Sequence, residues 1–409
     1  MANDAWIIDA VRSPRGIGKP GKGALSHLHP QKVLGQVLNG LAERTGIDTV
    51  DVEDVVTGNG SHAGDHAHDI GRMALLDAGW PITVPGVTLN RFCGSGQQAV
   101  SFAAMGVGAG HQDLVVGCGV ESMSRPARNG TDGFHANNEH LLATHPQVPQ
   151  GLSADLISAV DGWTREQCDE VGLISQQRAK VAIDEGRFER SLITILNDDG
   201  TVALDHDEYP RPETTAEVLA GLNPSFPKMD DHKMEQSDLT MREMIAQKYP
   251  GIELTHMHHA GNSSGVVDGA GAVLVSSPAY ARAHGLTPRA RVVMTAVAAD
   301  EPLIMLTAPG PAALRCLDKA GMTIDDIDLV EVNEAFASVV LRFLADTGFD
   351  REKVNVNGGA IALGHPIGAT GSMLTGTVID ELERRDLQTG LVAMCTGGGM
   401  GTATIVERI

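Results

Sequence analysis

Short runs of β-branched and aliphatic residues alternate along most of the chain with segments whose apolar residues recur at helical spacing. Trp6–Asp9, Val52–Gly58 and Asp113–Cys118 read as strands, whereas Lys32–Arg44 and Ile70–Ala78 read as helices. Strands that alternate with helices in this way predict an α/β fold with a layered sheet.

One stretch, Val84–Ala99, organises the rest of the pattern. A β-branched strand stops at Asn90, Cys93 follows in a tight turn, and glycines 94 and 96 precede a helical segment. A thiol at this place faces the positive end of a helix dipole, which favours thiolate over thiol. Cys93 is therefore a candidate nucleophile. The alternative is a small buried residue in a glycine-tight turn.

The last third of the chain repeats the order of elements of the first third. Three pairs of segments correspond: Val52–Gly58 with Ile327–Val332, Val87–Asn90 with Val354–Asn357, and Asp113–Gly119 with Gly390–Gly397. The repeat places His365 where the first copy has Cys93. It predicts two α/β halves, residues 1–277 and 278–409, with a region of about 125–259 inserted before the last strand of the first half.

The inserted region is polar and holds half of the 16 histidines and eight of the 19 prolines. Arg165–Gly186 reads as its one clear helix, and the charged, methionine-rich Pro227–Gly251 reads as a surface helix with flexible flanks. The region is therefore expected to cover another part of the protein rather than to form a core.

Composition narrows the class of protein. An apolar content of 42% and a charged content of 20% are ordinary for a globular protein, and a net charge of −21 argues against nucleic acid or an anionic membrane as partner. The sequence lacks a visible secretory signal and an apolar run of membrane-spanning length. Five scattered cysteines without a CxxC pair indicate neither a disulfide framework nor a thiolate metal site. A reducing compartment, the cytoplasm, is expected.

Four short motifs can carry chemistry. They are Cys93-Gly-Ser, Asn333-Glu-Ala-Phe336, Gly364-His365-Pro366 and Cys395-Thr-Gly397. The glycines after Cys395 allow the close backbone approach that an oxyanion hole requires. Polar side chains such as Asn333 at the end of a buried strand are costly unless they are paired or take part in function.

A dinucleotide-binding loop is the rival interpretation of Gly94-x-Gly96-x-x-Ala99. That motif needs an acidic residue at the end of the next strand, which here ends in Cys118-Gly119. The rival fails, and the two glycines are better interpreted as backbone space for a thioester.

In this order and spacing the motifs resemble the thiolase family over essentially the whole chain. The matching blocks are NRFCGSGQQAV, ESMSRP, AGNSSGVVDGAGAVL, DIDLVEVNEAFAS, NVNGGAIALGHPIGATGS and CTGGGMGTATI. NEAF separates ordinary thiolases from lipid-transfer-linked members and decarboxylating ketoacyl synthases. The resemblance implies two duplicated halves with mixed five-stranded sheets in a layered α-β-α-β-α core, an inserted loop domain, and a homodimer or homotetramer.

The resemblance also implies a mechanism. Cys93 would attack the carbonyl of an acyl-CoA or 3-ketoacyl-CoA to form a thioester. His365 would take the thiol proton and, with a water held by Asn333, bind the thioester oxygen. Cys395 would be the acid and base at Cα of acetyl-CoA, and the N–H groups of Cys93 and Gly397 would form a second oxyanion hole.

Coenzyme A contacts follow from the same resemblance. Ser264, with Ala260 and Gly261 beside it, matches the family serine near the pantetheine chain. Phe336, the last residue of the NEAF motif, is expected among the residues that bind the substrate or CoA. Arg211 matches an arginine that reaches the nucleotide end in some members; the alternative is a solvated loop charge. CoA and acetyl-CoA are expected as substrates, with no bound cofactor.

No metal is expected either. His256, His258 and His259 form a cluster, but without further ligands at a recognisable spacing they are interpreted as loop histidines. The remaining cysteines match no motif and are expected to be structural: Cys118, Cys168 and Cys316.

Two departures from the family bear on the substrate. Many acetoacetyl-CoA-specific members have His-Met-Gly in the loop domain where this chain has Pro149-Gln150-Gly151, and Pro227–Gly251 is longer than usual. Both favour a bulkier acyl chain. The prediction is a thiolase of fatty-acid or related lipid degradation. Alternatives are a biosynthetic acetoacetyl-CoA thiolase, a malonyl-using ketoacyl synthase and a non-catalytic acyl-CoA or lipid-binding protein.

Overall fold

The computed structural model describes residues 4–125, 134, 136, 138–234 and 236–409. Residues 1–3 and parts of the predicted insertion (126–133, 135, 137 and 235) lie outside the described residues, as does the last residue of the ESMSRP block. We use "first half" for the elements from β1 to β8 without the insertion, and "second half" for those from β9 onward. The boundary between residues 277 and 278 stays a prediction.

The first half alternates strands and helices as the apolar pattern predicts. Its elements are β1 (Trp6–Arg12), β2 (Gly16–Ile17), α1 (Pro30–Thr45), β3 (Asp54–Gly58), α2 (Ile70–Asp77), β4 (Gly86–Leu89), α3 (Ser95–Gly108), β5 (Leu114–Ser122) and β8 (Val267–Ser276). The short helix α9 (Pro278–Ala283) leads into the second half.

The second half repeats this order. Its elements are β9 (Ala290–Ala299), α10 (Pro309–Ala320), β10 (Leu329–Val332), α11 (Ala337–Thr347), α12 (Ala360–Leu363), α13 (Thr370–Arg385), β11 (Thr389–Thr396) and β12 (Met400–Arg408). In each half a parallel pair, β3 with β5 and β10 with β11, is followed by an antiparallel neighbour, β8 or β12. The matching pairing pattern supports the duplication that the sequence indicates.

The two sheets join edge to edge. The strand order is β10-β11-β12-β9-β1-β8-β5-β3-β4, and β1 meets β9 through only two residue pairs. The first half has five strands in this path and the second half four. At the place of its fifth strand the second half has a single bridge, Val330 to Val354. Asn355 ends the pairing there because its side-chain amide bonds both the N–H and the C=O of Val332 and its φ is +50°.

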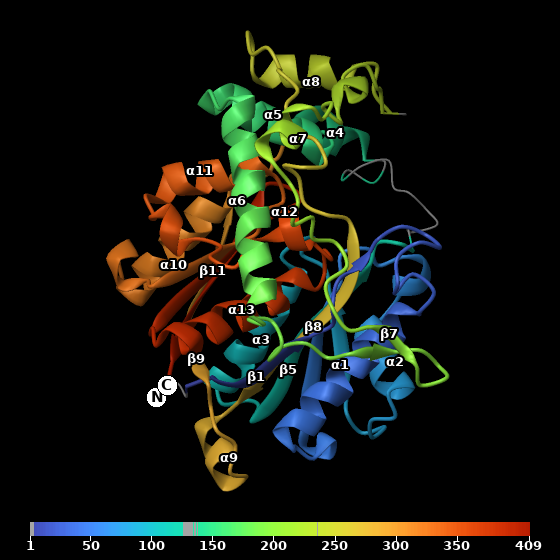
Figure 1. The fold of residues 1–409 in the computed structure, drawn as a ribbon, viewed down its shortest axis with the longest axis vertical. Coiled ribbons are helices and arrows are strands. Elements are labelled where there is room, and N and C mark those ends of the chain that lie inside the picture. Colours follow the sequence, from blue (N-terminus) through green and yellow to red (C-terminus); the bar gives the residue numbers. More distant parts are fainter. Residues whose placement is uncertain (1–3, 126–133, 135, 137, 235) are drawn as a thin grey trace.

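Helices lie on both faces of each sheet and between the sheets. α1 and α2 pack on the outer face of the first sheet, α10 and α11 on that of the second, and α3 contacts α13 between them (Figure 1). α13 buries most of its residues because it is covered on all sides, whereas α1 buries one apolar face. The layered α-β-α-β-α core is as predicted.

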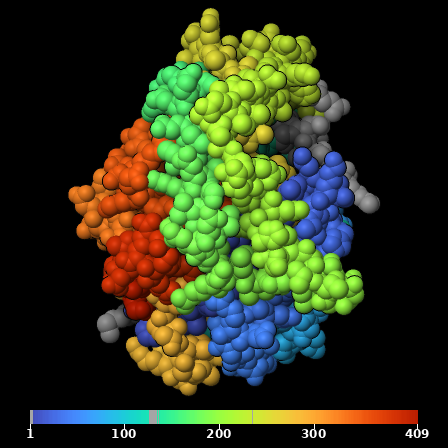
Figure 2. All heavy atoms as spheres, viewed as in Figure 1, coloured from blue at the N-terminus to red at the C-terminus, as the bar shows by residue number. Residues whose placement is uncertain are grey.

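The insertion between β5 and β8 contains more regular structure than its polar composition indicates. Its elements are α4 (Glu139–Thr144), α5 (Gln150–Asp161), α6 (Arg165–Asp184), β6 (Ile195–Leu196), β7 (Val202–Leu204), α7 (Ala216–Ala220) and α8 (Met241–Lys248). α6 runs along the front of the molecule, and in Figure 2 the inserted residues, green to yellow, cover the middle of this face between the blue first half and the red second half.

The expectation of a coreless cover with one helix was wrong. α5 and α8 bury an apolar cluster against the loop before α10, and the side chains of Met241, Met244 and Ile245 are buried in it. Pro227–Gly251 is therefore not simply a surface helix. Among its described residues, 241–248 form an α-helix, which begins with a capping box between Thr240 and Glu243. Met234, Met241 and Met244 lie in the apolar cluster of the insertion, whereas Met229 is exposed.

Candidate active site

Cys93 lies in the turn between β4 and α3. Side chains of its neighbours fix this turn: Asn90 Oδ1 accepts the N–H of Phe92 at 2.7 Å, and the Ser95 hydroxyl accepts from the N–H of Arg91 while donating to the carbonyl of Phe92. Phe92 has a φ of +49°, an uncommon conformation for an aromatic residue. The turn therefore holds the thiol in a backbone geometry that several hydrogen bonds determine.

Glycines 94 and 96 bring the two halves together. A Cβ on Gly94 would lie 2.7 Å from Cγ2 of Thr396, and one on Gly96 would lie 2.6 Å from the carbonyl oxygen of Gly368. The interpretation of these glycines as space for a thioester is therefore corrected. They make space for the second half, and so bring the Cys93 turn against the end of β11 and the loop that follows His365.

The Cys93 thiol is buried and protonated at rest. Burial raises its pKa to about 11, and the Gln150 side chain and the backbone N–H of Gly397 offset this only in part. The argument that the helix dipole favours a resting thiolate was wrong in its outcome. The second half and the insertion remove water from the sulfur, and this desolvation outweighs the helix end.

Cys395 is the second-to-last residue of β11 and lies next to Cys93. Burial is the main cause that raises the pKa of Cys395 well above its ordinary value, and repulsion by Cys93 adds to it. The chain then passes through Gly397 to two glycines with φ of +77°, and a Cβ on Gly399 would lie 2.5 Å from the carbonyl oxygen of Asp300. This run turns the backbone so that the Gly397 N–H faces the Cys93 sulfur.

His365 and Asn333 form a second pair. His365 Nε2 lies 3.4 Å from Asn333 Nδ2, and His365 Nδ1 lies 2.6 Å from the Thr370 hydroxyl. Since that hydroxyl donates to the carbonyl of Pro366, it accepts from Nδ1–H, which leaves the lone pair on Nε2. Burial, with the nearby charge of Arg15, lowers the pKa of His365 to about 3, so the ring is neutral. The Asn333 Oδ1 atom is buried without a partner in the described part of the chain.

Buried carboxylates hold the frame around these side chains. Glu334 accepts from Ser175 of α6, from Asn355 and from the N–H of Ile361. Glu121 of β5 accepts the N–H of Gly368 at 2.9 Å and so ties the first half to the His365 loop. Of the two polar residues predicted at the end of β10, Glu334 is paired, whereas Asn333 keeps a free oxygen.

The predicted CoA residues line one pocket of about 910 Å³. Its lining includes Ser264, Ala260, Gly261 and Arg211, and it extends to Tyr209 and the loop before α7. Ser264 is held by its N–H, which donates to the carbonyl of Ala335 at 2.9 Å. The four predicted residues, far apart in sequence, are therefore brought together.

Arg211 and Phe336 differ from the simple expectation. The guanidinium of Arg211 donates to carbonyls of its own loop and stacks over Tyr209, with 5.3 Å to the ring centroid. Phe336 does not line this pocket. Its buried ring packs edge-on against Phe226 and His258, and its backbone forms a bridge with Ser263 beside Ser264. Phe336 therefore supports the pocket from behind.

Sequence reasoning missed three groups. Gln150 Nε2 lies 4.0 Å from Cys93 Sγ, Thr370 fixes the tautomer of His365, and Lys19 and Lys22 line the CoA pocket. A family motif difference pointed to the position of Gln150 without its contact, and Thr370 stands five residues after His365. The lysines lie in the Gly/Lys/Pro-rich loop after β1, which carried no other signal.

The histidines before Ala260 are structural. His256 lies between Asp155 and Asp230 at 2.8 and 3.0 Å, His258 contacts Asp155, and His259 contacts Asp169. They lie in a loop, as predicted, and His258 and His259 are buried there. No group of three or more His, Cys, Asp or Glu side chains able to hold a metal occurs in the described part of the chain.

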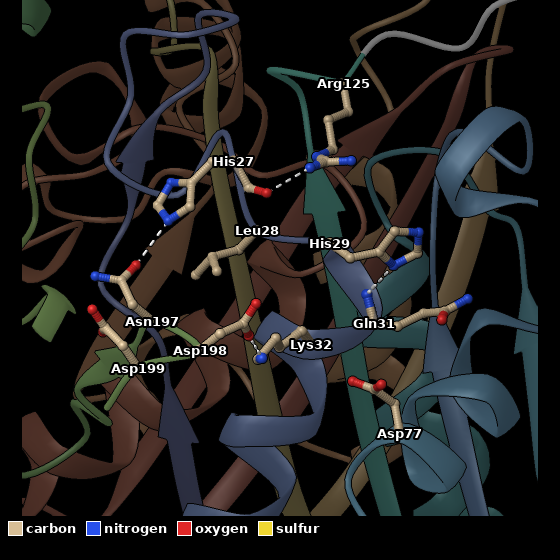
Figure 3. A pocket seen from close by; sticks show the side chains of 10 residues that line it. All are labelled: His27, Leu28, His29, Gln31, Lys32, Asp77, Arg125, Asn197, Asp198 and Asp199. Atoms are coloured by element: carbon tan, nitrogen blue, oxygen red, sulfur yellow. Dashed lines mark hydrogen bonds and ion pairs between the residues drawn. The ribbon is translucent and has the colours of Figure 1, made fainter. Parts of the chain in front are cut away.

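A second pocket, of about 670 Å³, opens at the N-terminal end of α1 (Figure 3). Several of its polar side chains already have partners: Lys32 pairs with Asp198, His27 bonds Asn197, and Arg125 donates to the carbonyl of His27. None of the predicted catalytic or CoA-binding residues lines it.

Comparisons with known proteins agree with this geometry. Residues 5–231 match the N-terminal domain of thiolases and residues 286–408 the C-terminal domain. A steroid 3-ketoacyl-CoA thiolase of Mycobacterium tuberculosis is 40% identical over 420 residues, which cover 100% of this chain and 95% of that protein.

Two solved structures share the whole fold. The acetyl-CoA acetyltransferase of Bacillus anthracis has a TM-score of 0.85 at 35% identity and covers 100% of this chain and 99% of its own. Human mitochondrial 3-ketoacyl-CoA thiolase in complex with CoA has a TM-score of 0.84 at 32% identity. The match covers 100% of this chain and 99% of the human chain.

Fold and relatives together define an acyltransferase with a duplicated α/β core. The chain belongs to the thiolase family. The family and layered fold predicted from the sequence motifs are confirmed. Among the described residues, no helix has the length and apolar character needed to cross a membrane.

Proposed function

We propose that this thiolase cleaves 3-ketoacyl-CoA with CoA, giving acyl-CoA and acetyl-CoA, through a Cys93 thioester. The observation that carries the proposal is the meeting of two buried thiols from the two halves, Cys93 and Cys395, beside the Gly397 N–H. A nucleophile, a proton donor and an oxyanion donor are the three parts that acyl transfer of this kind needs.

In the first step, Cys93 Sγ attacks C3 of the 3-ketoacyl-CoA and its proton passes to His365 Nε2. Because the resting pair is a thiol and a neutral imidazole, the thiolate forms as the attack proceeds. The Asn333 Oδ1 atom can accept from a water that donates to the developing oxyanion, since Oδ1 has no other partner in the described part of the chain.

In the second step, the bond between C2 and C3 breaks and its electrons form the enolate of acetyl-CoA. Cys395 gives its proton to C2, so acetyl-CoA leaves and the acyl group stays on Cys93. A CoA thiol then attacks the thioester carbonyl and gives its proton to the Cys395 thiolate. The bond from the carbonyl carbon to Cys93 Sγ breaks, His365 returns its proton to Cys93, and acyl-CoA departs. The N–H groups of Cys93 and Gly397 stabilise the second oxyanion.

We further propose that CoA lies in the pocket of Ser264, Ala260 and Gly261. Lys19 and Lys22 also line this pocket, so cationic side chains are available to the phosphates in a chain whose net charge is −21. Arg211 would contribute by supporting the loop at the pocket wall, because its guanidinium is engaged with loop carbonyls.

For the acyl group, we propose a chain longer or bulkier than acetyl, in fatty-acid or related lipid degradation. The support is Pro149-Gln150-Gly151 in place of His-Met-Gly, together with a relative named as a steroid thiolase. Thiolysis rates with 3-ketoacyl-CoAs from acetoacetyl-CoA upward, one of them ring-bearing, test this. A sharp optimum at acetoacetyl-CoA would contradict it.

A homodimer or homotetramer in the cytoplasm completes the proposal. β4 ends the described sheet with a free edge, and Val87 on it and Phe102 and Met105 on α3 are exposed apolar residues. All five cysteines are free, as a reducing compartment permits. Light scattering after gel filtration reports the mass in solution.

The central experiment concerns Cys93. Cys93→Ala should abolish thiolysis, and incubation of the native protein with 3-ketoacyl-CoA in the absence of free CoA should leave an acyl adduct on the peptide that contains Cys93. Retention of full thiolysis by Cys93→Ala would overturn the mechanism.

A further inference from the structure

One side chain of the insertion reaches the nucleophile. Gln150 is the first residue of α5, and its Nε2 lies 4.0 Å from Cys93 Sγ, within hydrogen-bond distance for sulfur. Cys93 is buried at the meeting of the two halves, so this contact ties the thiol to the insertion.

The helix that carries Gln150 is fixed from several sides. Ser153 donates to the carbonyl of Leu303, and Asp155 accepts the N–H groups of both Met257 and His258. A Cβ on Gly151 would lie 2.4 Å from the Phe226 ring, so the backbone beside Gln150 packs closely on that ring. A side chain on such a rigid support can hold a partner in one place.

The side-chain amide of Gln150 is a neutral hydrogen-bond donor to the Cys93 sulfur, whereas the nearby Glu121 disfavours a negative charge on that sulfur. The titratable and charged groups that face Cys93 are Glu121 from β5, which disfavours a thiolate, the neutral thiol of Cys395 from β11, and His365, which takes the Cys93 proton in the proposed mechanism. The donors toward the sulfur are Gln150 from the insertion, the backbone N–H of Gly397 from the second half and the backbone N–H of Cys93 itself. Of these three donors, Gln150 is the one that mutation can remove without altering the backbone.

We propose that Gln150 is a positioning residue that holds the Cys93 sulfur for attack and stabilises the negative charge on it through the side-chain amide. This inference rests on the proposed role of Cys93 and extends it to the insertion. A methionine has nearly the same length and no N–H, so a chain with Met at this position lacks this donor.

The test measures the reactivity of Cys93 directly. The wild-type protein, Gln150→Met and Gln150→Glu are treated with iodoacetamide across a pH series, and alkylation is followed on the peptide that contains Cys93. In Gln150→Met the rate near neutral pH should fall about tenfold, the factor expected when a hydrogen bond to a charged group is lost. The apparent pKa should rise, so the variant should stay slower than wild type throughout the pH range in which the protein remains folded. Gln150→Glu should fall further, because a carboxylate repels the thiolate.

Gln147→Met is the matched control. Gln147 lies three residues earlier on the same segment and is buried, and its side chain has no hydrogen bond to Cys93. Its variant should keep the wild-type alkylation profile. In thiolysis assays Gln150→Met should lower kcat and leave KM for CoA unchanged.

Two outcomes would overturn the inference. If Gln150→Met changes acyl-chain preference but keeps the wild-type alkylation profile, Gln150 only lines the acyl site. If Gln147→Met shifts the profile as much, the effect belongs to the segment and not to the amide. Failure of the proposed function would appear separately, as thiolysis by Cys93→Ala.

Discussion

The two halves place a cysteine at the same point of the same strand, with different consequences. Cys118 in β5 and Cys395 in β11 occupy matching positions of the repeat. β5 continues four residues beyond Cys118, to Ser122, whereas β11 ends one residue after Cys395. β11 stops close to Cys395, so this thiol lies at the seam, by which we mean the contact of the Cys93 turn and α3 with the second half. Cys118 lies within its strand instead.

The surroundings follow from that difference. The Cys118 sulfur lies 3.1 Å from the Thr57 hydroxyl on the neighbouring strand and belongs to the core under α1 and α2. Cys395 belongs instead to the apolar cluster that the insertion shares with the second half, and it interacts with Cys93. Two thiols therefore occupy matching positions of the repeat, and both are buried. Only Cys395 lies beside Cys93 at the reacting centre.

The largest test of this comparison replaces each cysteine by serine. Cys395→Ser should lower thiolysis about 100-fold or more, since loss of a positioned acid and base costs on the order of 10²–10⁴. Cys118→Ser should keep nearly full activity because Thr57 can bond a hydroxyl as well as a thiol. Steady-state thiolysis checks both, and an equal loss in the two variants would remove the distinction.

The seam itself can be broken at Gly96. A Cβ at this position would lie 2.6 Å from the Gly368 carbonyl, so Gly96→Ala should cost about 1–3 kcal/mol of unfolding free energy and lower activity. Gly106→Ala on the same helix is the control, because there a Cβ meets only the end of the flexible Gln112 side chain. Urea unfolding of both variants checks the prediction. A Gly106 variant as unstable as the Gly96 variant would point to the helix rather than the seam.

Alkaline pH should weaken the protein through its buried thiols. Burial raises the pKa of Cys118 from 9.0 to about 12, so the folded state holds the proton more tightly than the unfolded chain. The stability due to this neutral thiol is complete below pH 9 and is lost as the pH rises toward 12. The unfolding free energy of Cys118→Ala should therefore fall less steeply than that of the wild type between about pH 9 and pH 11. Parallel curves for the two proteins would contradict the assignment.

The smallest effect is expected at Thr370. Thr370→Val removes the acceptor of His365 Nδ1–H, so part of the imidazole takes the tautomer with its proton on Nε2, and kcat should fall about three- to tenfold. Thr370→Ser keeps the hydroxyl and should stay near wild type. A serine variant as slow as the valine variant would show that the methyl group matters instead.

Local sequence signals predicted what depends on neighbouring residues. The short apolar run at Val52–Gly58 and the helical spacing of Lys32–Arg44 predicted β3 and α1 nearly at their observed bounds. The repeat then identified His365 as the counterpart of Cys93. The strand and the helix follow from apolar patterns that a short window of sequence contains, a buried run and a period of about 3.6 residues.

Features that depend on packing between segments far apart in the chain could not be predicted from the sequence. Met241 and Leu152 form a core only because α8 folds back on α5, so a polar composition concealed it. The helix-dipole argument for Cys93 missed the burial contributed by the other half. The fifth strand of the second half is lost to one side chain, Asn355, whose amide replaces backbone pairing.

The position of the insertion has a consequence for synthesis of the chain. β8, which follows the insertion, lies between β1 and β5 in the first sheet. A nascent chain that ends before Val267 therefore leaves β1 and β5 without their shared partner, each with an open edge. The first sheet can be completed only after residue 276 leaves the ribosome, although its other strands have been synthesised by Ser122. The register of β1 is thus chosen late, over a separation of more than 250 residues, and folding should be slow and dependent on chaperones.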